Sequence, residues 1–279
     1  MRLHPSRGVI ACLILLPPLA YLARADSLLF VNGGNGLLSR ANLDGSNLQN
    51  FSELNPIPLY HQGGISLHEN KLYWGAPGNY FSTNLDGSNQ QPLSTVPDPV
   101  RIKLLGGVLD SAGNAYFSYD DTLGGASVIQ RFAPGDSDPN ATIYTSTRFS
   151  PKPGLAIDLL HSKIYWAGGW NQLDAGLLQR SNLDGSNIET LYTGQELHFE
   201  DYPIDLEIDP LNNMIYWTGN MSWIARAPLD GSTPPQILLT AAPIESLALE
   251  LSVPEPTTLT LLLPIALLLL RRRHRANHL

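Results

Sequence analysis

The residues of this chain that could do chemistry are carboxylates within short β-strand patterns. Asp205 and Glu207 share one such pattern, and Asp110 and Asp158 end two others. Carboxylates that converge on one point can hold a divalent cation, which activates water for hydrolysis. These strands contain no histidine, and the sequence has neither a Gly-x-Ser-x-Gly elbow nor a phosphate-binding loop. Metal-dependent hydrolysis is therefore the weaker interpretation of the chain.

The other candidate metal ligands are poorly arranged for binding. His61, His68, His161 and His198 are scattered, and no pair has the i, i+4 spacing of a helical zinc site. The recurring Asp-Gly segments offer too few oxygen ligands for a calcium loop of the EF-hand type. They have instead the composition of tight turns, because Gly tolerates positive φ and Asp bonds its own backbone. We expect no metal and no cofactor.

The elements that must position these residues recur along the chain. The tetrapeptide Leu-Asp-Gly-Ser and an aromatic pair within an apolar run repeat in phase, every 40 to 50 residues or so, which is the period of a four-stranded propeller blade. The sequence therefore predicts an all-β fold, a β-propeller of antiparallel blades. The tetrapeptides begin at Leu43, Leu85, Leu183 and Leu229, and the aromatic pairs are Tyr73-Trp74, Tyr116-Phe117, Tyr165-Trp166 and Tyr216-Trp217.

The spacing favours five blades, with six as the alternative. The first repeat lacks an inner strand, since it begins directly with the strand pattern at 28–31. An unassigned strand pattern at 244–249 follows the fifth repeat. If these two segments pair, the N- and C-terminal strands share the closing blade and no sheet edge is left open. No helical periodicity is apparent between the two ends of the chain.

The aromatic pairs are expected to be structural. Adjacent strand residues point to opposite faces, so Tyr165 and Trp166 should pack on the two sides of their blade.

The repeats are similar to a known family. The pairing of 156–158 with 163–166, echoed by 207–209 with 214–218, resembles the YWTD repeat, which is the class B repeat of the low-density-lipoprotein receptor family. The resemblance covers nearly all of 27–250 and implies a propeller that binds other proteins and has no catalytic activity. That family has six blades and an Asp after the aromatic pair. The Asp is absent here, which implies that contacts between blades depend more on apolar packing.

One face of the ring should carry longer loops than the other. In an antiparallel four-stranded meander, the loops after the second and fourth strands share one face, here called the loop face. The turns after the first and third strands share the opposite face, here called the turn face. Aromatic side chains beside carboxylates on the loop face would suit recognition of protein or sugar, although the aromatics could simply close the loop ends. The candidate binding residues are Tyr80, Asp120, Asp121, Trp170, His198, Phe199, Glu200, Asp201, Tyr202 and Trp223.

The amino end has the pattern of a signal peptide. Residues 1–25 combine two early arginines with a long apolar run and an Ala-Arg-Ala ending, which predicts cleavage between Ala25 and Asp26. The propeller then spans 26–252. Cys12, the only cysteine, lies in the signal segment, so no disulfide is expected in the mature protein.

The carboxyl end, 253–275, has a three-part pattern and is followed by a short tail, 276–279. Pro254, Glu255 and Pro256 precede an apolar run, which leads into a basic cluster that includes Arg271, Arg272 and Arg273. This order resembles the PEP-CTERM sorting tail of Gram-negative bacteria, which implies processing by a membrane-embedded exosortase. As a helix the run would reach about 21 Å, short of the ~30 Å hydrocarbon core. A permanent transmembrane anchor is the alternative.

Charge limits the expected partners. The chain has a formal net charge of −8, and residues 26–252 contain ten basic and 24 acidic residues. Such a surface repels nucleic acid. The sequence therefore favours an exported, non-enzymatic binding module at the cell surface, with an extracellular protein or polysaccharide as ligand and a membrane contact through the C-terminal segment. The alternatives are an extracellular hydrolase or lactonase with a central metal, and a passive component of an exopolysaccharide layer.

Overall fold

The computed structural model describes twelve ranges between residues 26 and 251, and Asp26–Val253 form one compact unit. The expected signal segment and the expected sorting segment, with Ala25, Pro254 to Pro256 and Arg271 to Arg273, lie outside the described residues. Among the described residues, no helix has the length and apolar character needed to span a bilayer. The described ranges are 26–32, 35–56, 64–76, 79–104, 106–121, 126–136, 138–146, 154–168, 177–193, 203–219, 223–240 and 244–251.

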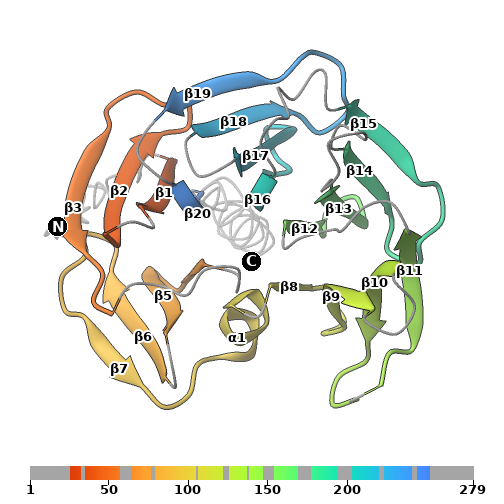
Figure 1. Ribbon diagram of the computed structural model, residues 1–279, viewed down its shortest axis with the longest axis horizontal. Helices are drawn as coiled ribbons and strands as arrows, with labels where there is room; N and C mark the ends of the chain where they lie inside the picture. The colour runs from red at the N-terminus through yellow and green to blue at the C-terminus, as the bar shows by residue number, and fades with distance from the viewer. Residues whose placement is uncertain are drawn as a thin grey trace, which may run out of the picture. The chain divides into compact units, whose positions relative to one another are not determined.

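The chain is a five-bladed β-propeller, in which each blade is a four-stranded antiparallel sheet (Figure 1). Five blades were expected, and the six-bladed alternative is wrong. Blades 2 to 5 run in chain order from the axis outward. Blade 2 is β4 (Ile65–His68), β5 (Lys71–Ala76), β6 (Asn79–Asn84) and β7 (Gln91–Leu93); blade 3 is β8 (Gly107–Leu109), β9 (Ala115–Asp121), β10 (Ala126–Phe132) and β11 (Ala141–Ser146); blade 4 is β12 (Leu155–Asp158), β13 (Lys163–Gly168), β14 (Leu177–Asn182) and β15 (Glu189–Thr193); blade 5 is β16 (Pro203–Asp209), β17 (Met214–Gly219), β18 (Trp223–Pro228) and β19 (Gln236–Thr240).

Blade 1 is built from both ends of the unit. It consists of β20 (Ile244–Glu250), β1 (Ser27–Asn32), β2 (Leu37–Asn42) and β3 (Gln49–Glu53), in that order from the axis. β20 pairs antiparallel with β1, so that Leu28 faces Leu249 and Phe30 faces Leu247. The predicted closure by a shared blade is confirmed. Because both strands are almost wholly buried, apolar burial as well as backbone hydrogen bonding holds the ring shut.

The pair Tyr165-Trp166 packs on the two sides of its blade, as predicted. Tyr165 and Trp166 are each 1% exposed and lie in different apolar clusters. Tyr165 packs with residues of blade 5, such as Leu206, whereas Trp166 packs with residues of blade 3, such as Ile129. The alternation of side chains along β13 therefore joins blade 4 to both of its neighbours.

The Leu-Asp-Gly-Ser turns also join neighbouring blades. Within the turn, the Asp44 carboxylate accepts hydrogen bonds from the N–H and the hydroxyl of Ser46, at 2.9 and 2.6 Å. This confirms the turn interpretation. Gly185 has φ +83°, and a Cβ there would lie 2.6 Å from the carbonyl oxygen of Ile143 in the preceding blade. The glycines of the other three copies meet the outer strand of the preceding blade in the same way: Gly45 meets Leu238, Gly87 meets Ser52 and Gly231 meets Leu191.

Polar contacts supplement apolar packing between blades. A guanidinium nitrogen of Arg180 in blade 4 donates to the carbonyl of Leu229 in blade 5 at 2.8 Å. Arg226 in blade 5 donates to the carbonyl of Leu43 in blade 1 at 3.0 Å. Two basic side chains thus reach across to the next Leu-Asp-Gly turn, a contact that the repeat pattern did not predict.

Among the described residues, one helix interrupts the β-structure, although none was expected between the two ends of the chain. α1 (Asp98–Leu104) lies between β7 and β8, near the axis (Figure 1). Val100 and Leu104 on this helix are buried against Tyr73 of blade 2. The inner strand of blade 3, β8, begins only at Gly107, after the helix. Seven residues make about two turns, too few for a helical period to emerge from the sequence.

Candidate functional site

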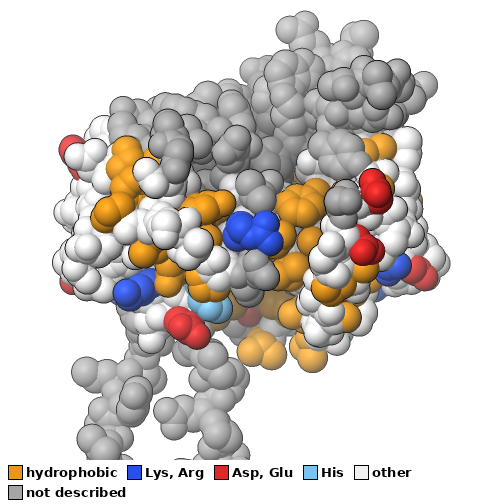
Figure 2. All heavy atoms as spheres, turned by 90° about the horizontal axis from the view of Figure 1, so that it is seen from below, with side chains coloured by type: hydrophobic (Ala, Val, Ile, Leu, Met, Phe, Trp, Pro, Cys, Tyr) orange, Lys and Arg blue, Asp and Glu red, His pale blue; other side chains and the backbone are white. Residues whose placement is uncertain are grey.

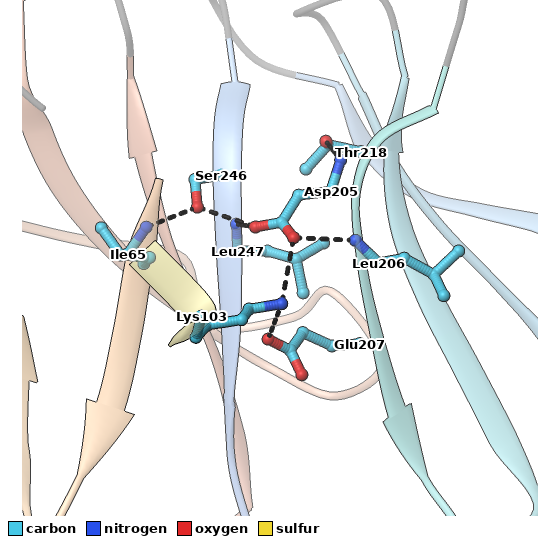
Figure 3. Close-up of polar contacts among 8 residues, drawn as sticks. All are labelled: Ile65, Lys103, Asp205, Leu206, Glu207, Thr218, Ser246 and Leu247. Carbon is cyan, nitrogen blue, oxygen red and sulfur yellow. Dashed lines mark hydrogen bonds and ion pairs between the residues drawn. The ribbon is translucent and has the colours of Figure 1, made fainter. Parts of the chain in front are cut away.

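The axis of the propeller carries a buried ion-pair cluster. Asp205 and Glu207 lie on β16, the inner strand of blade 5, and Lys103 reaches them from α1. The Lys103 ammonium lies 3.3 Å from an Asp205 oxygen and 2.9 Å from a Glu207 oxygen. The cluster thus joins the connection between blades 2 and 3 to the facing blade 5 (Figure 3).

Asp205 is saturated with hydrogen-bond donors. One oxygen accepts from the Ser246 hydroxyl at 2.8 Å and from the Leu247 N–H at 3.0 Å. The other oxygen accepts from the Leu206 N–H at 2.9 Å and from Lys103. A buried carboxylate is stable only when its lone pairs are used in this way. Asp205 therefore fastens the closing strand β20 to blade 5.

Ser246 extends the network to blade 2. Its hydroxyl oxygen accepts a hydrogen bond from the Ile65 N–H at 2.8 Å, and the same hydroxyl donates a hydrogen bond to Asp205. Gly64 precedes Ile65 with φ +52°, and any Cβ at Gly64 would overlap the Ser246 side chain. Glycine at this position is thus required both by the backbone and by the close approach of the serine.

Burial and the neighbouring charges shift the pKa values of Lys103 and Glu207. Burial alone would lower the pKa of Lys103, but Asp205 and Glu207 outweigh burial and raise it, so the lysine stays charged. Burial raises the pKa of Glu207, the Asp205 charge raises it further, and Lys103 offsets only part of this rise. One ammonium therefore faces two carboxylates, and the charged form of Glu207 is disfavoured.

The two other carboxylates named in the sequence analysis, Asp110 and Asp158, cap turns. Asp158 accepts hydrogen bonds from the N–H and ring Nδ1 of His161, at 2.9 and 2.7 Å. Asp110 accepts from the N–H of Asn114 at 2.9 Å and from the Tyr116 hydroxyl at 3.1 Å. Burial favours a higher pKa for Asp110, but these hydrogen bonds outweigh it and lower the pKa. These carboxylates hold the first turn of their blades.

The described residues contain no group of three or more His, Cys, Asp or Glu side chains that could hold a metal ion. At the axis, the Lys103 ammonium already lies between Asp205 and Glu207, the position a divalent cation would need. The two carboxylates on β16 thus fit the role of lysine partners better than that of metal ligands.

Two adjoining recesses open beside this cluster, with volumes of about 350 and 290 Å³. Both are lined by Lys103, Val108, Ile157 and Glu207. Their other lining residues include His68, Leu159, Leu160 and Pro210, which lie at the ends of first strands or in the turns that follow. The recesses therefore open on the turn face.

The rim of the ring, viewed from the side on which α1 lies, shows hydrophobic side chains on both flanks of a basic one (Figure 2).

The structure describes only part of the predicted loop-face site. Trp170 and residues 198–202 lie outside the described residues. Asp120 and Asp121 end β9, the second strand of blade 3. They pair with Ser127 and Ala126 of β10.

Of the two predicted aromatics that are described, neither stands free on the surface. Tyr80 is half-buried and packs against the apolar cluster of Tyr73, Val100 and Leu104. Trp223 is 8% exposed and belongs to the core around Leu206, which fits the alternative that the aromatics close the loop ends. The absence of a side chain at Gly219 leaves the space that the Trp223 indole fills, since a Cβ would overlap it.

Two residues of the axial site were not expected from the sequence. Lys103 lies in a segment without a recognisable period, and Ser246 is one of several small residues in the closing strand. The nearest signal was the pair of carboxylates on one predicted inner strand, Asp205 and Glu207, which drew attention to the axis.

No protein-family model matches the chain. The chain is similar to one from a nidogen/laminin complex, with a TM-score of 0.41 and 15% identity over 76% of this chain and 78% of that one. It is also similar to the TolB candidate from Agrobacterium tumefaciens, with a TM-score of 0.40 and 13% identity over 78% and 70% of the two chains. Similarities of this size say nothing of activity or ligand.

Proposed function

We propose that the protein is an exported, non-enzymatic propeller that binds a protein or a glycan at the cell surface. The observation that carries the proposal is the use of the axial carboxylates. Asp205 is committed to closing the ring and Lys103 fills the space between Asp205 and Glu207, so the inner strands form a rigid scaffold. Recesses remain open on the turn face beside that scaffold.

Export and display rest on the sequence. The signal pattern in 1–25 and the order of Pro254-Glu255-Pro256, an apolar run and an arginine cluster support secretion followed by exosortase-type processing. The similarity to YWTD repeats in 27–250 supports binding rather than catalysis. An acidic ring, with ten basic against 24 acidic residues in 26–252, supports ligands that are neutral or basic.

A capture experiment tests the proposal. The unit Asp26–Val253, which contains its whole core and both strands of the closing pair, is immobilised and exposed to outer-surface extracts and to purified polysaccharides. We expect a specific protein or glycan to be retained. A matched variant with Trp170→Ala and Asp121→Asn, both on the predicted loop face, tests whether that face contributes.

Metal analysis of the same unit separates binding from hydrolysis. We expect no stoichiometric divalent ion after gel filtration. One tightly held divalent ion per chain, together with failure to retain any partner, would contradict the proposal and support the hydrolase alternative.

A further inference from the structure

Within the described axial cluster, the Glu207 side chain accepts a single hydrogen bond. One of its oxygens accepts the hydrogen bond from Lys103 at 2.9 Å. The other oxygen points away from the cluster (Figure 3) and has no hydrogen-bond partner among the described residues. The side chain is 24% exposed and lines both recesses. It therefore presents a free acceptor to the recesses.

Among the described residues, the ion pairs at this point leave one negative charge unbalanced. Lys103 supplies one positive charge, whereas Asp205 and Glu207 supply two negative ones. Asp205 is further stabilised by three uncharged donors, namely the Ser246 hydroxyl and the N–H groups of Leu206 and Leu247. Glu207 accepts from none of these three donors, so keeping its buried side chain charged costs free energy. A strongly perturbed carboxyl group in a recess is typical of a ligand site.

The walls of the recesses are mostly apolar. Val100, Val108, Ile157 and Leu249 lie along them, contributed by α1 and three different blades. At the rim, Leu159 and Leu160 are 52% and 62% exposed. Their separate volumes, about 350 and 290 Å³, lie near the lower limit for ligand pockets. Such a site suits a ligand with an aliphatic stem and a single charged end.

We propose that this recess on the turn face binds a lysine or arginine side chain presented by a partner protein. The cationic end would meet the free oxygen of Glu207, and the methylene stem would lie against Val108 and Ile157. Lysine and arginine side chains combine an apolar stem with a charged head in this way. The inference rests on the proposed binding function and assigns it a ligand chemistry at a second face, opposite the predicted loop-face site.

A titration with small probes tests the site directly. The probes are Nα-acetyl-arginine methylamide, the corresponding lysine derivative and, as the uncharged isostere, Nα-acetyl-citrulline methylamide. Binding to the ¹⁵N-labelled unit Asp26–Val253 is followed by chemical-shift changes. We expect saturable changes at Val108 and Ile157 with the two basic probes, and binding about tenfold weaker with citrulline, because a charge-assisted hydrogen bond is lost. Equal binding of citrulline and arginine would overturn the inference.

Matched variants complete the test. Glu207→Gln should weaken the arginine probe about tenfold while the ring remains folded, since the amide still accepts from Lys103. Glu53→Gln, an exposed change on the outer strand β3, should leave binding unchanged. Undiminished probe binding by Glu207→Gln would contradict the site. Partner capture by a wild-type ring that binds no basic probe would refute this inference alone, whereas probe binding without any captured partner would count against the proposed function alone.

Discussion

The hydroxyl of Ser246 connects Asp205 of blade 5 to the backbone of Ile65 in blade 2, with hydrogen bonds of 2.8 Å on both sides. Ser246 itself belongs to β20, the closing strand of blade 1. Three blades therefore meet at one small side chain. A hydroxyl has one donor and can accept, so both of these roles are filled without a second residue.

The first prediction concerns this serine. Ser246→Ala should lower the free energy of unfolding by about 1–3 kcal/mol, because it leaves the Ile65 N–H and one acceptor site of Asp205 without their partner in a buried position. Urea unfolding of the unit Asp26–Val253 measures the effect. Ser232→Ala, an exposed change in a Leu-Asp-Gly-Ser turn, is the control. Equal stabilities of the two variants would show that the Ser246 bridge is not needed for closure.

A second prediction concerns the carboxylate itself. Asp205→Ala should cost about 3–5 kcal/mol, since it leaves the Ser246 hydroxyl and the N–H groups of Leu206 and Leu247 buried without their acceptor, while Lys103 keeps only Glu207. Lys103→Met should cost less in the Asp205→Ala background than in the wild type, because Asp205 is then no longer left without its cation. Asp138→Ala, an exposed substitution in blade 3, provides the reference. Strict additivity of the two axial substitutions in urea unfolding would show that Asp205 and Lys103 are not coupled.

A third prediction concerns Glu207 and pH. Its pKa is raised in the folded state by burial and by Asp205, so the folded ring binds a proton more tightly than the unfolded chain does. The stability linked to this group is present below its unfolded pKa and is lost as the pH rises through its folded pKa. Glu207→Gln should therefore be more stable than the wild type at neutral pH, and the difference should shrink in acid.

Thermal unfolding of both proteins between pH 4 and pH 8 checks this behaviour. For a domain of this size, each kcal/mol of relief raises the melting temperature by roughly 2–4 °C. The difference between the two proteins isolates Glu207 from the titration of other carboxylates, such as Asp44 and Asp86, whose pKa values are lowered by hydrogen bonds from neighbouring serines. Among the described residues, the other ionisable groups near Glu207 are Lys103, Asp205 and, along the same recess, His68. A wild type that is more stable than the variant at neutral pH would contradict the argument.

A fourth prediction separates backbone strain from contact between blades. Gly135 and Gly185 both have φ +83°, but a Cβ at Gly135 meets nothing within 4 Å, whereas one at Gly185 lies 2.6 Å from the Ile143 carbonyl. Gly135→Ala should thus cost only the left-handed backbone penalty, about 1–2 kcal/mol. Gly185→Ala should cost more, because blades 3 and 4 must separate. The two free energies of unfolding give the comparison, and equal values would exclude an interblade role for the turn.

Much of the fold could be predicted because it is written as a repeat. The period of the Leu-Asp-Gly-Ser turns fixes the blade length, and alternation along a strand places Tyr165 and Trp166 on opposite sides of their blade. The unassigned strand at 244–249 had one partner available, namely β1. These are consequences of periodicity and of the need to cover a sheet edge.

The site was harder to predict because it departs from the repeat. α1 is too short to show a period, and its Lys103 contacts a strand 102 residues later in the chain. Counting strands places Trp223 at the loop face, but it does not give the direction of the side chain. That direction depends on the space above Gly219, which only the three-dimensional packing reveals.

The pairing of β20 with β1 also sets the order in which the molecule can be completed. Residues 244–250, which form β20, are synthesised after every other described strand. β1 therefore has no inner partner until β20 has been made. A nascent chain that stops before this segment would contain four complete sheets and one with an uncovered edge. Prematurely terminated products should therefore be recognisable to proteases and prone to self-association, while the finished ring offers neither opportunity.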